Sequence, residues 1–203
     1  AVSGGGAAGF GHVGGLETLD ALGGKPCAIA GTSAGAVVGA AYASGMSGAE
    51  IRAHILDLVD RPLEAAATIW RAHLSEGLNL LRPVAARAAV ATVLPAAVQD
   101  AYDALECPLT VVATDYRART PEAFRDGGLR EALAASVAIP GVFAPVEIAD
   151  RIYVDGGVSN NLPYDLLPPD SFRLAVDVAT EPDSVEKDMP GSLEVTAGAM
   201  RIL

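Results

Sequence analysis

The sequence predicts an α/β fold of three layers, in which a mostly parallel central sheet carries helices on both faces. Apolar segments of strand length occur at 27–30, 109–114 and 174–179, and they lack the strict alternation of a sheet with one wet face. Segments with helical spacing lie between them, which is typical of a sheet whose strands are connected by helices. With 203 residues, 51% of them hydrophobic, the chain is expected to form a single domain with a buried core.

The first element is a glycine-rich run, 4–9 (GGGAAG), which opens a helical pattern that ends at Gly23-Gly24. Successive glycines at a helix start leave backbone N–H groups pointing at one spot, in front of the positive end of the helix dipole. Such a nest can bind a phosphate or the oxyanion of a tetrahedral intermediate. The letters also fit the dinucleotide fingerprint G-x-G-x-x-G, but the next strand lacks the acidic residue which that fingerprint expects at its end. The oxyanion interpretation is therefore favoured.

The second element is Gly31-Thr32-Ser33-Ala34-Gly35, directly after the apolar run 27–30 and directly before a helix-forming run. Strand, sharp turn and helix are the context in which a G-x-S-x-G serine becomes an exposed nucleophile. The turn brings strand and helix close together, so Gly31 and Gly35 must lack side chains. Ser33 as an ordinary helix N-cap is the alternative, but an N-cap does not need glycine on both sides.

A serine hydroxyl needs a base, and the usual order of residues is serine, acid, histidine. The chain has three histidines, at 12, 54 and 73, and none follows the last candidate acid, Asp155. Asp155 opens the sequence Asp-Gly-Gly after the strand-like segment 151–154 (RIYV). We therefore predict a serine with a carboxylate base.

A second Asp-Gly-Gly occurs at 126–128, between loop-like Pro121-Glu122 and a helical run that starts at Leu129. Because no strand is predicted before it, we expect Asp126 to lie in a turn or a helix cap. Asn160-Asn161, which follow Asp155, are interpreted as polar turn residues.

Four motifs in order resemble the patatin-like phospholipase family. They are GGGAAGFGHVGGLETL, GTSAG, LREALAASVAIPGVFAPV at 129–146, and YVDGGVSNNLP at 153–163. The resemblance covers nearly the whole chain and implies a single patatin-like catalytic domain over 1–203. Ser136, within the third motif, is expected to be structural.

Carried over by position, the resemblance makes Ser33 the nucleophile and Asp155 its base, with no metal and no organic cofactor. The oxyanion hole would consist of backbone amides, those of Gly5, Gly6, Ala7 and Ala34. Many members carry Arg or Lys where Ala8 stands. Its absence leaves the amides without a neighbouring positive charge, which weakens the oxyanion site or shifts its substrate preference.

The activity that the resemblance implies is hydrolysis of lipid acyl esters, of the phospholipase A or lysophospholipase type. Two alternatives stay open. One is an acyltransferase that uses the same dyad, although the missing histidine argues against the usual acyl-carrier transferases. The other is a catalytically silent lipid-binding module, for which Ala8 leaves room.

The net charge of −11 argues against nucleic acid and against simple electrostatic adhesion to an anionic membrane. Residues 51–90 depart from this balance, with five arginines against four acidic residues and the only tryptophan, Trp70. We interpret 51–105 as a helical cover or insertion, and 51–90 either as its lipid-facing part or as ordinary helices over the sheet. Helices are expected at 34–44, 47–58, 62–73, 78–92 and 97–105.

The chain begins without methionine inside an expected strand and ends inside an expected helix, so we expect both ends to be cut relative to the native protein. No apolar stretch is long enough to span a bilayer. The predicted protein is therefore cytoplasmic or peripherally associated with a membrane or micelle surface, and a removed signal peptide stays compatible with the sequence.

Overall fold

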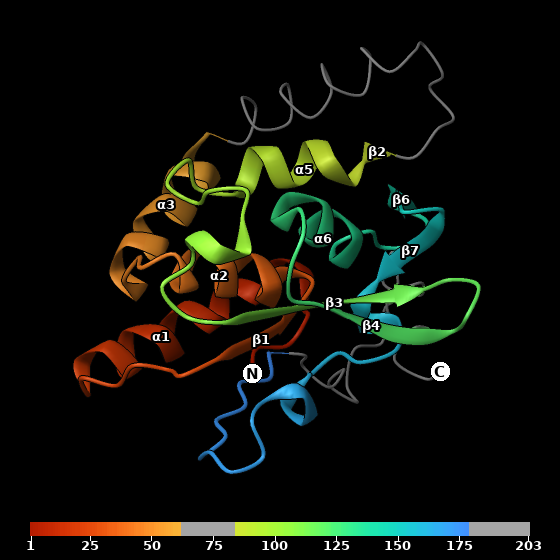
Figure 1. Cartoon of the computed structure of the whole chain (residues 1–203). Helices are drawn as coiled ribbons and strands as arrows, with labels where there is room; N and C mark the ends of the chain where they lie inside the picture. The colour runs from red at the N-terminus through yellow and green to blue at the C-terminus, as the bar shows by residue number, and fades with distance from the viewer. Residues whose placement is uncertain (62–83, 179–203) are drawn as a thin grey trace, which may run out of the picture.

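A computed structural model describes residues 1–61 and 84–178 of the chain (Figure 1). Its helices are η1 (Gly6–Gly11), α1 (His12–Ala21), α2 (Ala34–Ala43), α3 (Gly48–Asp60), α5 (Ala86–Val93), η2 (Tyr102–Ala104), α6 (Leu129–Ser136), η3 (Gly156–Val158) and η4 (Tyr164–Leu166). Its strands are β1 (Ile29–Thr32), β2 (Val84–Ala85), β3 (Leu109–Asp115), β4 (Thr120–Phe124), β5 (Phe143–Ala144), β6 (Val146–Ile148) and β7 (Arg151–Asp155).

The predicted helices 34–44 and 47–58 are confirmed, and the described part of 78–92 is helical only from Ala86, because Val84–Ala85 forms β2. Helix α3 begins with a capping box, in which Ser47 and Glu50 satisfy each other's backbone N–H groups. The predicted helix 62–73 and the first part of 78–92 lie outside the described residues. The predicted helix 97–105 is wrong, because only the short η2 forms there. Asp100, which precedes η2, accepts a hydrogen bond from the first turn of α6, so its side chain caps α6 and not a helix of its own segment.

The α/β class is confirmed, but the sheet is mixed. Strands β1 and β3 pair in parallel, whereas β3 pairs antiparallel with both β4 and β7, and β7 pairs antiparallel with β6. The predicted strand at 174–179 contributes an isolated parallel bridge between Val176 and Val2, and Val2 makes a second such bridge to Gly31. The parallel character is therefore limited to one half of the sheet.

Two tight turns account for the antiparallel pairs β3–β4 and β6–β7. Ala149 and Asp150, between β6 and β7, both have positive φ, of 47° and 62°, as a two-residue hairpin turn requires. Arg119, with φ 59°, ends the short turn from β3 to β4. Such turns return the chain to the neighbouring strand without a crossover helix, so the pairing must be antiparallel.

The register around β3 brings two strand ends together. Val111 and Val112 pair with β1 and also with β4, so β1 and β4 lie on opposite sides of β3. Ala113 pairs with β4 and with Asp155 of β7, so β7 lies on the same side as β1. Strand β1 is parallel to β3 and ends opposite residue 112. Strand β7 is antiparallel to β3 and ends opposite residue 113. The ends of β1 and β7 therefore meet head-on.

Helices α2 and α6 pack against this central strand and against each other, and α5 packs on α6 (Figure 1). The face that α2 buries consists largely of glycine and alanine, which lets the helix axis approach the sheet closely. A side chain at Gly39 would begin 3.1 Å from Ile29 Cγ2. The core around α6 is completed by Leu129 and Leu133, both fully buried.

Candidate functional site

Ser33 lies at the sharp turn between β1 and α2, as the sequence predicts. Its backbone has φ 53° and ψ −123°, a combination that residues with a side chain rarely adopt and that clusters at functional sites. A Cβ at Gly31 would lie 2.8 Å from Ala36 Cα, and one at Gly35 would meet the backbone oxygens of Ser3 and Val2. Both glycines are therefore required by crowding, and the turn is a nucleophile elbow in geometry.

Asp155, the last residue of β7, faces the elbow across the junction of the two strands. Ser33 Oγ donates a hydrogen bond of 2.7 Å to Asp155 Oδ2, and the N–H of Gly157 donates one of 2.7 Å to Oδ1. Each of the two side chains is nearly buried, with 5% of the residue surface exposed. Two residues that are 122 positions apart in the sequence thus form a closed polar pair.

Burial determines the acidity of this carboxyl group. Removal from water penalises the ionised form and raises the pKa of Asp155 to about 6, although the hydrogen bonds from Ser33 and from the N–H of Gly157 act in the opposite direction. A carboxylate with this pKa is a stronger base than an exposed aspartate and is still ionised at neutral pH.

The loop after Asp155 is tied to both neighbouring strands. Thr114 Oγ1 of β3 donates to the Asp155 carbonyl at 2.8 Å, and Thr32 Oγ1 of β1 donates to the Asn160 carbonyl at 2.8 Å. A Cβ at Gly156 would collide with the Val112 carbonyl oxygen. The loop can therefore approach the elbow only because residue 156 has no side chain.

The glycine-rich run lies against the same elbow. A Cβ at Gly4 would lie 3.2 Å from Ser33 Cβ and 2.5 Å from Asn161 Oδ1, and one at Gly9 would lie 2.5 Å from Ala34 Cβ. Gly6 has φ +54°, which turns the backbone into η1. Within the described part of the chain, no protein partner is recorded for the N–H groups of Gly5, Gly6 and Ala34. Among the described residues, these three N–H groups are therefore not used by the fold.

The sequence analysis expected Ser136 to be structural but did not predict its contact with the elbow. Ser136, the last residue of α6, accepts a 2.8 Å hydrogen bond from the N–H of Ser33 and donates one of 2.6 Å to the Val112 carbonyl. The signal that could have found it is a single polar residue that closes the apolar run 132–135, since a buried hydroxyl needs partners.

Neither of the described histidines is hydrogen-bonded to Ser33 or Asp155. Nε2 of His12 donates to the Ser3 carbonyl at 2.7 Å, and burial lowers the pKa of this imidazole. Nε2 of His54 lies 2.9 Å from the Val93 carbonyl. His73 lies outside the described residues.

Asp126 is exposed and lies in a turn, as expected, but the reason given for that expectation was wrong. A strand, β4, does precede it. This strand pairs with the side of β3 that faces away from β1. The two Asp-Gly-Gly copies therefore follow strands on opposite edges of β3, and only the copy at 155–157 reaches Ser33.

An apolar cavity of about 340 Å³ lies at the other end of β1, where Val2, Leu16 and Ile29 contribute to its wall. Neither Ser33 nor Asp155 lines it. In residues 1–61 and 84–178, no group of His, Cys, Asp or Glu has the geometry of a metal site, and no helix is long and apolar enough to cross a membrane.

Comparison with known proteins places this arrangement in a family. The sequence model described as Patatin-like phospholipase matches residues 1–168. An NTE family protein of Mycobacterium tuberculosis (strain ATCC 25618 / H37Rv) is 37% identical over 170 residues, which are 80% of this chain and 43% of that protein. Patatin-like phospholipase domain-containing protein 6 of Mus musculus is 29% identical over 191 residues, 90% of this chain and 14% of that protein.

Among solved structures, VipD from Legionella pneumophila has the same fold, with a TM-score of 0.52 at 18% identity over 80% of this chain and 46% of that chain. The chain spans less than half the length of each of these relatives. The family match over 1–168, on an α/β fold with a serine elbow facing an aspartate, shows that the chain belongs to the patatin-like phospholipase family.

Proposed function

We propose that this chain hydrolyses the carboxylic esters of lipids through a dyad of Ser33 and Asp155, with phospholipids or lysophospholipids as the substrate class. The observation that carries the proposal is the 2.7 Å hydrogen bond from Ser33 Oγ to Asp155 Oδ2 in a nearly buried position. A serine hydroxyl becomes an effective nucleophile when a base accepts its proton along such a bond.

The reaction has two halves. Asp155 accepts the hydroxyl proton while Ser33 Oγ forms a bond to the ester carbonyl carbon, and the carbonyl π electrons move to oxygen. The tetrahedral intermediate then collapses, the ester C–O bond breaks, and the leaving alkoxide takes the proton from Asp155. In the second half Asp155 deprotonates a water molecule that attacks the acyl-enzyme, and the fatty acid and free Ser33 are released.

The oxyanion would be stabilised by backbone N–H groups of the glycine-rich run, those of Gly5, Gly6 and Ala7, together with the N–H of Ala34. The free donors and the position of the run against the elbow support this assignment. The N-terminus of α2 adds the positive end of its dipole. Loss of one such donor typically lowers kcat by about 10²–10³-fold.

The part of the protein that would contact the lipid surface is proposed from the sequence alone. Trp70 and Arg71 lie outside the described residues, within the segment that combines the only tryptophan with several arginines in an otherwise acidic chain. Tryptophan favours membrane interfaces, where its ring is buried and its N–H stays wet. We expect the double variant Trp70→Ala/Arg71→Ala to lose activity on phospholipid vesicles but not on a soluble p-nitrophenyl ester, because only docking is removed.

The decisive test is labelling with a fluorophosphonate probe, followed by peptide mapping and by product analysis with phosphatidylcholine vesicles. We expect the label on Ser33, release of free fatty acid, and loss of both in Ser33→Ala. Transfer of the acyl group to an added alcohol in place of water would support the acyltransferase alternative. A folded protein that takes no label would be a silent lipid-binding module, and the proposal would fail.

A further inference from the structure

The backbone of Ser33 is held by a residue outside the dyad. Ser136 is fully buried, and its hydroxyl lies between the N–H of Ser33, at 2.8 Å, and the carbonyl of Val112, at 2.6 Å. A hydroxyl has a single proton, and the carbonyl can only accept, so that proton points to Val112 and a lone pair of Ser136 faces Ser33. The direction of both hydrogen bonds is thereby fixed.

This contact has two effects on the elbow. Ser33 has the strained combination of φ 53° and ψ −123°, which persists only where the surroundings impose it. A hydrogen bond to its N–H fixes the orientation of the peptide group between Thr32 and Ser33, and with it the direction of the side chain. It also satisfies a buried donor that would otherwise be without a partner. The next amide, that of Ala34, has no protein partner among the described residues.

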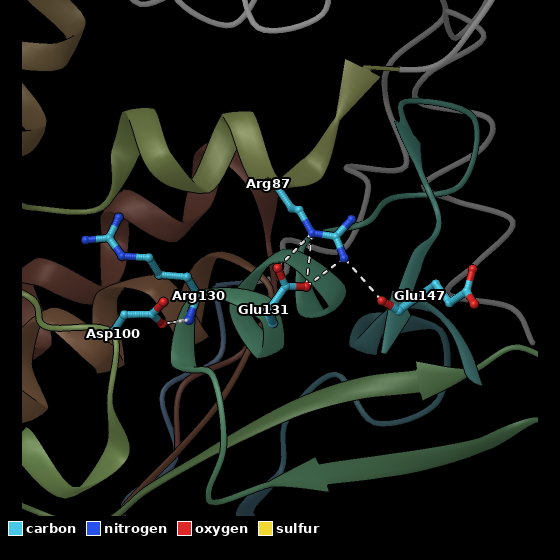
Figure 2. Close-up of polar contacts among 5 residues, drawn as sticks. All are labelled: Arg87, Asp100, Arg130, Glu131 and Glu147. Carbon is cyan, nitrogen blue, oxygen red and sulfur yellow. Dashed lines mark hydrogen bonds and ion pairs between the residues drawn. The ribbon is translucent and has the colours of Figure 1, made fainter. Parts of the chain in front are cut away.

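The helix that carries Ser136 is fixed at its first turn by the segment 84–105. Figure 2 shows Arg87 of α5 between Glu131 of α6 and the carbonyl of Glu147 in β6. Arg87 Nε lies 2.8 Å from Glu131 Oε1 and Nη2 lies 2.7 Å from Oε2, a two-bond contact with the carboxylate.

The same turn of α6 has a second anchor. Asp100 Oδ1 accepts a 2.7 Å hydrogen bond from the N–H of Arg130 (Figure 2). Arg130 Nη2 also donates to the Val98 carbonyl at 3.2 Å. Helix α6 is therefore attached to the neighbouring segment at its start and contacts the elbow with its last residue.

From this arrangement we propose that Ser136 is a positioning residue for the nucleophile, at the end of a helix whose first turn is attached to the segment 84–105. The inference rests on the proposed Ser33–Asp155 chemistry. Ser136 does not touch the reacting atoms, so its loss leaves the base and the substrate site intact and disturbs the alignment of Ser33 Oγ.

The test compares Ser136→Ala with Val90→Ala, a matched control that removes buried volume from α5 without contact with the elbow. With a soluble p-nitrophenyl ester we expect Ser136→Ala to lower kcat about tenfold, the factor that corresponds to one lost hydrogen bond, with KM and the acid limb of the pH profile unchanged. Val90→Ala should lower the melting temperature and leave kcat within about twofold. Ser136→Cys keeps the volume with a weaker hydrogen-bonding group, and its kcat should lie between those of Ser136→Ala and wild type.

A measurement without substrate separates this inference from the proposed function. Amide hydrogen exchange followed by NMR should show faster exchange of the Ser33 N–H in Ser136→Ala and Ser136→Cys, with the Ala113 N–H unchanged, whether or not the protein hydrolyses esters. Val90→Ala should speed both amides together. Unchanged Ser33 exchange in a folded Ser136 variant would overturn the inference, as would a kcat loss that Val90→Ala reproduces. An inactive wild-type protein with the expected exchange pattern would contradict the function and leave the positioning role supported.

Discussion

Two copies of Asp-Gly-Gly, at 126–128 and 155–157, follow two strands that pair with opposite sides of β3. At 155–157 the aspartate is nearly buried, accepts hydrogen bonds from Ser33 and Gly157, and has a raised pKa. At 126–128 the aspartate is exposed in a turn before α6. The same three letters therefore place a buried carboxyl group against Ser33 in one copy and an exposed turn in the other.

This difference shows that a strand before an Asp-Gly-Gly sequence is not enough to bring its aspartate to Ser33. Both copies have one, β4 before Asp126 and β7 before Asp155. What matters is which other strand ends at the same point. Strand β7 ends opposite residue 113 on the side where β1 ends opposite residue 112, so its last residue faces the elbow. Strand β4 lies across β3 from that junction.

The largest effect is expected from the aspartates themselves. Asp155→Asn should lower kcat/KM for a p-nitrophenyl ester by about 10⁴-fold, because the amide cannot accept the Ser33 proton. Asp126→Asn should leave kcat/KM unchanged. Circular dichroism would confirm that both variants are folded. If Asp126→Asn were the inactive variant, the choice between the two copies would be wrong.

The glycines next to the aspartates sharpen the comparison. Gly156→Ala would push a Cβ into the Val112 carbonyl and displace the acid loop, so we expect about a 10²-fold loss of kcat. Gly127→Ala is the matched variant, with open space around it but φ +79°. It should cost about 1–2 kcal/mol in the free energy of unfolding and leave kcat intact. Equal losses of kcat in the two variants would contradict the assignment of Asp155 over Asp126. Urea titration would give the free energy of unfolding of each variant.

The acid limb of the pH profile comes next in size. Because the pKa of Asp155 is raised to about 6, kcat/KM should fall about tenfold per pH unit below that value, in wild type and in Asp126→Asn alike. Between about pH 4 and 6 the folded state keeps a proton that the unfolded chain has lost, so this group lowers stability as pH rises through that window. Asp155→Asn should lack this stability change. An acid limb near pH 4 in the wild type would argue against a buried base.

The smallest effect is expected from His12. His12→Gln can keep a side-chain N–H directed at the Ser3 carbonyl, so kcat should stay within about threefold of wild type. His12→Ala leaves that carbonyl without its donor and should lower mainly the melting temperature. A folded but inactive His12→Gln would break the comparison, because it would indicate a histidine base in place of the carboxylate.

The site could be predicted from the sequence where local crowding dictates the residue type. Gly31 and Gly35 flank the elbow because any side chain there meets backbone, and the apolar run before Asp155 is a strand. The strand β6 was missed because its hairpin turn is Ala149-Asp150, which has none of the glycine or asparagine usual for two positive φ angles. The contact of Ser136 with Ser33 was not predicted, because it joins residues 103 positions apart.

Because β1 and β7 meet head-on, the contact between Ser33 and Asp155 depends on the assembly of the whole sheet. The dyad contact joins positions 122 apart, and nothing local brings them together before both strands have found β3. Contacts of such sequence separation are closed late in folding because loop closure must come first. The rate at which a fluorophosphonate labels Ser33 in increasing urea should therefore fall with the global unfolding transition.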